Sequence, residues 1–163
     1  MFRLGIDIGS VSISTAILNE NGTIVKSEYI RHKGKPYVVA KEAIERAISG
    51  YEIEFIATTG TGAKIFASLI GAPFVNEIVA VSRAMGRLHP ATGSIIDIGG
   101  EDSKLIIFEH TGKGNAPLRV KDFSMNALCA AGTGSFLEQQ ASRLRFTIEE
   151  FSEVALKAAN IPR

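Results

Sequence analysis

Residues 94–108 are SIIDIGGEDSKLIIF, a run of β-forming residues that is interrupted by an Asp, two glycines, a Glu and a second Asp. Residues 4–18, LGIDIGSVSISTAIL, have nearly the same design close to the start of the chain. Asp7 and Asp97 occupy the same place in the two stretches, at an offset of 90 residues. Each stretch predicts a strand, an Asp-Ile-Gly turn and a second strand, so the pair indicates an internal repeat.

The rest of the chain alternates between strand and helix patterns, which is typical of an α/β fold. In the first part we expect strands at 2–8, 13–19, 23–29 and 53–58, and helices at 37–49, 63–70 and 76–88. In the second part we expect strands at 94–98, 104–108 and 118–123, and helices at 135–144 and 147–159. A Thr147–Glu150 capping box opens the last helix. The pattern restarts after residues 89–93, which form the natural boundary.

Composition and charge exclude several classes of protein. Hydrophobic residues make up 45% of the chain and charged residues 21%, as in soluble globular domains. The net charge of +1, without a basic run, gives no indication of nucleic-acid binding. We find no signal segment and no apolar run long enough to cross a bilayer, so we expect no membrane association. The single cysteine, Cys129, excludes an intrachain disulfide, and the three histidines have no ligand spacing. Together these features favour the cytoplasm.

The residues of the repeated turn are suited to binding phosphate and a metal ion. A glycine-bearing turn between two strands lets several backbone N–H groups point at one spot, which suits a phosphate, and Ser10 and Ser12 add hydroxyl donors. The aspartate that precedes each turn repels phosphate but can hold Mg²⁺, which bridges to phosphate. Glu101 or Asp102 could orient a water molecule. Two such turns facing each other would clamp a polyphosphate.

Two further glycine-rich segments need an interpretation. Residues 59–64, TGTGAK, do not fit the Walker pattern because Ala63 separates the glycine from the lysine, so we expect a plain strand-to-helix loop. Residues 129–136, CAAGTGSF, place Gly-Thr-Gly before a helix, whose free N–H groups and dipole could face an anion. By spacing alone, Cys129 is either a small buried residue or a ligand.

The order of these motifs resembles the superfamily of actin, sugar kinases and heat-shock chaperone ATPases. Within it, IDIGGEDSK (96–104) and MNALCAAGTGSFLEQQA (125–141) are similar to the ATP-dependent activases of 2-hydroxyacyl-CoA dehydratases and the ATPase subunits of benzoyl-CoA reductases. The resemblance covers essentially the whole chain but only the first half or so of the family's length. It implies an α/β, ribonuclease H-like fold of the actin and sugar-kinase type, with a complete first lobe at 1–90 and a truncated second lobe at 91–163.

The resemblance also implies an activity. Members are cytoplasmic homodimers that use ATP to drive low-potential electron transfer to a CoA-ester dehydratase or reductase. A [4Fe-4S] cluster lies at the dimer interface, held by two cysteines from each subunit, and Cys129 matches the first. Asp7 and Asp97 match the Mg²⁺-side carboxylates, and Glu101 and Asp102 are the candidate catalytic residues. The positions expected to contact ATP or ADP are Gly9, Ser10, Val11, Ser12, Ile13, Ser14, Gly99, Gly100, Glu101, Lys104, Gly132, Thr133 and Gly134.

Three departures from the family pattern qualify this expectation. The second cysteine and the later adenosine-binding Gly-Gly segment are missing, so this chain alone cannot complete a cluster of four thiolates. Ser14 replaces a lysine that is frequent in the family, and Lys104, at the repeat-equivalent position, could compensate. We therefore expect an N-terminal piece of a longer activase, with exposed apolar surface and a tendency to self-associate.

Two other functions stay open. A small-molecule kinase of the same superfamily would use the two hairpins equally well, although the CAAGTG segment favours the activase. A non-catalytic nucleotide-binding module is the third alternative, because the adenosine half is missing.

Overall fold

The structure is a computed structural model that describes residues 1–109, 118–126 and 132–160. The chain divides into two compact units. Unit 1 comprises Met1–Ile95 and Ile106–Phe123, and unit 2 comprises Ile96–Leu105 and Ser124–Arg163. The boundaries between the units fall inside three strands of one sheet, so each unit consists of two separate segments of sequence. The lobe boundary near residue 90 stays a prediction.

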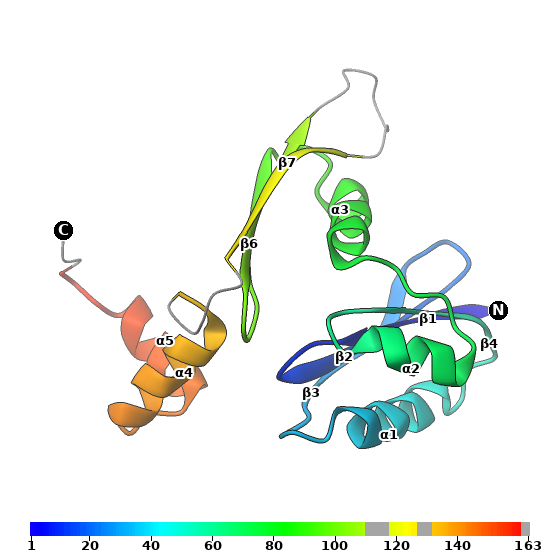
Figure 1. Ribbon diagram of the computed structural model, residues 1–163, viewed down its shortest axis with the longest axis horizontal. Helices are drawn as coiled ribbons and strands as arrows, with labels where there is room; N and C mark the ends of the chain where they lie inside the picture. The colour runs from blue at the N-terminus through cyan, green and yellow to red at the C-terminus, as the bar shows by residue number, and fades with distance from the viewer. Residues whose placement is uncertain (110–117, 127–131, 161–163) are drawn as a thin grey trace. The chain divides into compact units, whose positions relative to one another are not determined.

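Unit 1 is built on a four-stranded sheet with the strand order β3-β2-β1-β4 (Figure 1). Its strands are β1 (Phe2–Ile8), β2 (Ser12–Leu18), β3 (Ile24–Arg31) and β4 (Ile53–Thr59). β1 pairs antiparallel with β2 and parallel with β4, while β2 and β3 are antiparallel. All four predicted strands of the first part are confirmed, with ends that differ by two residues or fewer.

Two helices complete the core of unit 1. α1 (Pro36–Ile48) packs on β2 and β3, and α2 (Ala63–Ile70) packs on β4. Alternate residues of β1 point inward, because successive side chains of a strand face opposite sides of the sheet. The core consists of buried aliphatic and aromatic residues of these elements: Leu4, Ile6, Ile8, Ile13, Ile17, Ala40, Ala43, Ala47, Ala63 and Phe66.

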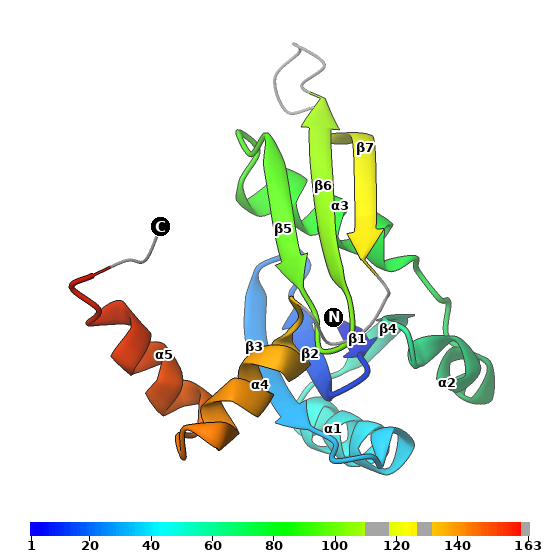
Figure 2. The ribbon, with the colours of Figure 1, turned by 60° about the vertical axis from the view of Figure 1, so that its left-hand side comes forward.

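A second sheet has the order β5-β6-β7, and its strands run alternately in opposite directions (Figure 2). These strands are β5 (Ser94–Ile98), β6 (Ser103–Glu109) and β7 (Arg119–Asn126). The part of this sheet that belongs to unit 1 packs on α3 (Glu77–Leu88), which contributes Ile78, Val81 and Met85 to a small cluster around Ile106 and Phe108.

Unit 2 ends in two helices, α4 (Gly134–Arg143) and α5 (Ile148–Leu156), which contact each other. The predicted capping box is confirmed, since the Thr147 hydroxyl accepts from the Glu150 N–H and the Glu150 carboxylate accepts from the Thr147 N–H. The prediction that α5 reaches residue 159 is wrong, because the helix ends at Leu156. Among the described helices, none has the length and apolarity needed to cross a membrane.

Candidate functional site

The first Asp-Ile-Gly turn is a tight connection between β1 and β2. The Gly9 N–H donates to the Ser12 carbonyl at 2.9 Å, which closes the turn around Ser10 and Val11. Asp7 lies one residue before the end of β1 and pairs in register with Ser14 on β2. The predicted nucleotide-contacting residues 9–14 therefore lie together at the end of β1.

The structure brings a segment to Asp7 that sequence analysis interpreted as a plain loop. Thr59, the last residue of β4, pairs in register with Asp7. Gly60, with φ of +98°, lies so close that an added Cβ would be 2.2 Å from Asp7 Oδ1 and 2.5 Å from the Ile8 carbonyl oxygen. The Gly62 N–H donates to the same Ile8 carbonyl at 2.8 Å. The TGTG segment thus packs closely against Asp7 and Ile8 at the end of β1.

His32 also belongs to this site, although its sequence position gave no indication of it. The side chain is 6% exposed, and its Nε2 lies 3.3 Å from the Gly9 carbonyl oxygen. Only the fold could show this contact, because 23 residues separate the two partners.

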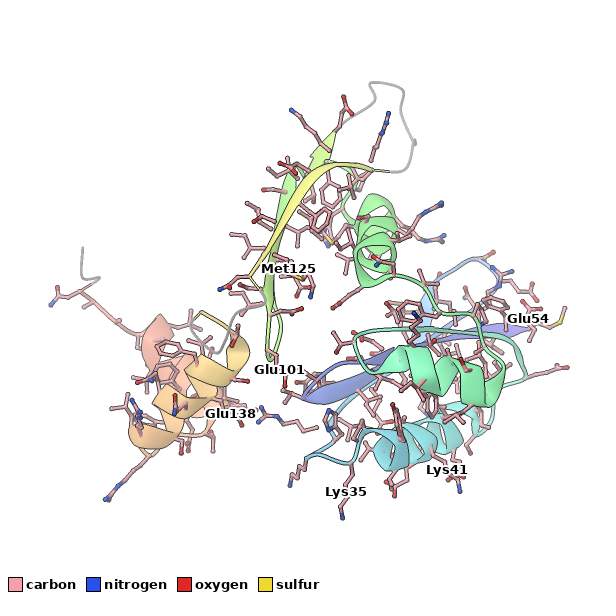
Figure 3. All side chains as sticks on the ribbon, in the orientation of Figure 1. Lys35, Lys41, Glu54, Glu101, Met125 and Glu138 are labelled. Carbon is pink, nitrogen blue, oxygen red and sulfur yellow. The ribbon has the colours of Figure 1, made fainter. Side chains whose placement is uncertain are left out.

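The second turn reproduces the first. The Gly99 N–H donates to the Asp102 carbonyl at 2.9 Å, in the same way that Gly9 bonds to Ser12. The residue numbers differ by 90 in both cases (99 from 9, and 102 from 12). This shared hydrogen bond confirms that the internal repeat is structural. Glu101 is exposed at the β5–β6 turn, where Figure 3 labels its side chain.

A buried lysine organises the second turn. Lys104 is only 5% exposed, and its ammonium group lies 2.9 Å from Asp102 Oδ1 and 3.9 Å from Asp97 Oδ2. One positive charge therefore stands close to two carboxylate groups and attracts both of them. Asp97, the candidate Mg²⁺ residue, keeps a side-chain exposure of 31%.

The Gly-Thr-Gly segment docks α4 on the second turn. The Gly134 N–H donates to the Gly99 carbonyl at 2.8 Å, and the Ser135 N–H donates to the Gly100 carbonyl at 3.1 Å. An added Cβ on Gly134 would lie 3.1 Å from the Gly99 carbonyl oxygen, so this close approach favours a glycine. The first two amides of α4 are therefore engaged by carbonyl groups of the second turn, and the anion contact of Gly132, Thr133 and Gly134 stays a prediction.

The surroundings of Asp7 show whether this candidate residue could bind Mg²⁺. Around Asp7, the Oδ1 atom is buried, and the neighbouring Thr59 hydroxyl is buried without a hydrogen bond within the described residues. A carboxylate and a hydroxyl are suitable oxygen donors for Mg²⁺. Asp7 therefore fits the ion. In the described ranges, no cluster of three or more His, Cys, Asp or Glu residues could hold a metal by itself. Cys129 lies outside the described residues.

The fold and the two glycine turns define the class of protein. The chain has the α/β fold of the actin-like ATPases, as its similarity to solved structures shows. It belongs to the BadF/BadG/BcrA/BcrD ATPase family, whose sequence profile matches residues 4–162.

Characterised relatives support this assignment. The chain is 35% identical over 163 residues to the activator of lactoyl-CoA dehydratase from Anaerotignum propionicum, and the match covers 98% of this chain and 60% of that protein. Thus the chain spans about 60% of the length of this relative.

Two solved structures are similar over 99% of the chain. The first is the activator of 2-hydroxyisocaproyl-CoA dehydratase from Clostridium difficile with bound ADPNP, at 29% identity and a TM-score of 0.81 over 59% of its length. The second is component A of (R)-2-hydroxyglutaryl-CoA dehydratase from Acidaminococcus fermentans, at 25% identity and a TM-score of 0.84 over 61% of its length.

Proposed function

We propose that this chain is the ATP-binding part of a dehydratase or reductase activase. The observation that carries the proposal is the repeated turn, in which Gly9 bonds to Ser12 as Gly99 bonds to Asp102. Two glycine turns of the same geometry, each preceded by an aspartate, provide backbone N–H groups for phosphates and carboxylates for a metal ion. The bound ADPNP of the similar Clostridium difficile activator supports a nucleoside triphosphate as the ligand.

The residues have distinct roles in this proposal. The amides and hydroxyls of residues 10–14 and the amide of Gly100 contact phosphate oxygens, while Gly99 lets the backbone of the second turn approach them closely. Asp7 and Asp97 are the carboxylates that would hold Mg²⁺, and the ion would neutralise charge on the phosphates when bound. Glu101, which is exposed, orients the water that attacks the terminal phosphate, while Asp102 positions Lys104.

The remaining expectations concern the complete protein. We propose that it acts as a homodimer, that Cys129 ligates a shared [4Fe-4S] cluster, and that the partner is a CoA-ester dehydratase or reductase. The names of the similar activators support a dehydratase as the partner. ATP binding would then change the arrangement of the cluster-bearing helices and so promote electron transfer.

The test of the metal assignment is nucleotide binding with and without Mg²⁺. We expect the wild-type chain to bind ATP more tightly when Mg²⁺ is present, measured by isothermal titration calorimetry. The substitution Asp97→Asn should abolish this gain, because the amide has no charge with which to hold the hydrated ion. Asp122→Asn is the matched control, since Asp122 is an exposed residue of β7 that belongs to neither turn.

The two negative outcomes of this binding experiment lead to different conclusions. If Asp97→Asn bound Mg-ATP as the wild type does, the metal role of Asp97 would be wrong while ATP binding stood. If the wild-type chain bound no nucleotide at all, ATP binding by this chain would be refuted.

A further inference from the structure

We propose that His32 is a positioning residue that holds the Gly9–Ser12 turn in the shape that binds phosphate. This role rests on the proposed ATP binding and adds to it a residue outside both glycine turns. His32 directly follows β3 and is buried, with 6% of its surface exposed. Its ring and its backbone both contact the first turn.

The hydrogen bonds determine which ring nitrogen carries the proton. The Gly34 N–H donates to Nδ1 of His32 at 3.2 Å, and a backbone amide can only donate, so Nδ1 must be the unprotonated acceptor. The proton of the neutral ring then lies on Nε2, which donates to the Gly9 carbonyl oxygen at 3.3 Å. A single neutral tautomer satisfies both contacts.

The backbone of His32 holds the other side of the same turn. Its N–H donates to the Val11 carbonyl at 3.1 Å, so His32 engages the carbonyl groups on both sides of Ser10. Its own carbonyl accepts from the N–H of Lys35, the N-cap residue of α1, at 2.9 Å. His32 thus fastens the turn to the start of a packed helix.

Peptide geometry connects these contacts to phosphate binding. In a planar trans peptide the C=O and the following N–H point in opposite directions, and the described chain has no cis peptide bond. Because the carbonyls of Gly9 and Val11 are directed toward His32, the N–H groups of Ser10 and Ser12 point away from it. These two amides become the donors that a phosphate oxygen would meet, fixed before the ligand arrives.

Three substitutions of His32 distinguish a role in positioning the Gly9–Ser12 turn from a general contribution to the stability of the protein. His32→Leu removes both ring contacts, whereas His32→Gln keeps an amide N–H that can reach the Gly9 carbonyl, and His32→Asn keeps an oxygen that can accept from Gly34. His89→Leu is the control, because His89 is an exposed histidine at the C-terminal end of α3. Inorganic tripolyphosphate with Mg²⁺ serves as the probe, since it contains no adenosine.

We expect the wild-type chain to bind tripolyphosphate with shifts of the Ser10 and Ser12 amide signals in ¹⁵N-resolved NMR. His32→Leu should bind about tenfold more weakly, since the turn amides lose their orientation. His32→Gln should recover most of this loss and His32→Asn much less, while His89→Leu binds as the wild type does. Long-range ¹⁵N spectra of the wild-type ring should show the proton on Nε2.

Three results would overturn the proposal. Equal binding by His32→Leu and the wild type would refute the positioning role and leave the proposed function intact. A proton on Nδ1 of the wild-type ring would refute the hydrogen-bond scheme even if every variant failed to fold. A wild-type chain that binds no polyphosphate would overturn the proposed function, and the role of His32 with it.

Discussion

At Gly60 there is space for a hydrogen atom and for nothing larger. Its φ of +98° is strained for any residue with a side chain, and the position of an added Cβ is only 2.2 Å from Asp7 Oδ1. The closest neighbours are a buried carboxylate oxygen and the backbone of Ile8, neither of which can move without disturbing β1. Gly60 therefore helps to define where the Asp7 carboxylate lies.

The first prediction concerns Gly60→Ala. We expect the free energy of unfolding to fall by about 2–4 kcal/mol, as the sum of backbone strain and overpacking. Urea unfolding followed by circular dichroism measures this change. Gly93→Ala is the control and should have little effect, because nothing lies within 4 Å of an added Cβ there. A Gly60→Ala chain as stable as the Gly93→Ala chain would show that β4 and β1 can separate at little cost.

The second prediction concerns Lys104→Met. The substitution leaves the Asp97 and Asp102 carboxylates near each other without the ammonium group between them. We expect a loss of about 1–3 kcal/mol in the stability of unit 2, since the carboxylates keep some access to water. Adding Asp102→Asn should restore part of this loss in a double-mutant cycle, measured by urea unfolding. If the effects of the two substitutions on the free energy of unfolding simply added, the ion pair between Lys104 and Asp102 would not be the cause of the loss.

Among the elements, α5 combines a well-defined start with an early end. The Thr147–Glu150 capping box satisfies two N–H groups at its first turn, and the hydrogen bond from the Thr147 N–H lowers the pKa of the Glu150 carboxyl. A lowered pKa in the folded state means that the contribution to stability is present above the ordinary carboxyl pKa and is lost as the pH falls through the lowered value.

The third prediction follows from the direction of this pKa shift. Glu150→Ala should reduce the helix content and thermal stability at neutral pH, and its difference from the wild type should shrink as the pH falls through the lowered pKa of Glu150. Circular dichroism between neutral and acidic pH measures both quantities. Glu149→Ala is the control, because Glu149 is an acidic residue of the same helical turn but not a member of the capping box. A difference between Glu150→Ala and the wild type that does not depend on pH would rule out the carboxylate as its source.

Local patterns predicted most of the elements correctly, and the errors have physical causes. α2 begins and ends as predicted, since Gly71 adopts the left-handed conformation that ends a helix. The predicted extension of α5 relied on the good helix formers Lys157, Ala158 and Ala159, but Leu156 is 86% exposed, so nothing packs there to support another turn.

The candidate site was predictable only where its residues are close in the sequence. Both turns were recognisable from Asp-Ile-Gly, since that chemistry lies within a few residues. The contact of Gly60 with Asp7 depends on parallel pairing of β1 and β4, and the contact of His32 with Gly9 depends on β3 joining β2. No periodicity in the sequence encodes such long-range contacts.

For the molecule as a whole, the two units differ in how much apolar surface they bury. Unit 1 contains both hydrophobic clusters. In the described part of unit 2, Ala141 is the only buried hydrophobic residue. Its large exposed apolar side chains are Ile96, Ile98, Leu105, Met125, Phe136, Leu137, Leu144, Phe146, Val154 and Leu156. Because apolar burial is the main source of stability, unit 2 should be the weaker of the two.

The fourth prediction is that unit 2 opens without unit 1. Hydrogen exchange should give amides in α4 and α5 an opening free energy at least about 2 kcal/mol below that of amides in β1 and β2. Binding of a hydrophobic dye and concentration-dependent light scattering should accompany this opening, since the exposed side chains of unit 2 favour self-association. Leu144→Ser is a useful variant, because Leu144 is 59% exposed and its replacement should lower the scattering without loss of stability. Equal protection of amides in α4 and β1 would mean that the two units unfold together, and the prediction would be wrong. The exposed apolar residues of unit 2 would then have to be covered by contacts that stabilise it as much as the core stabilises unit 1.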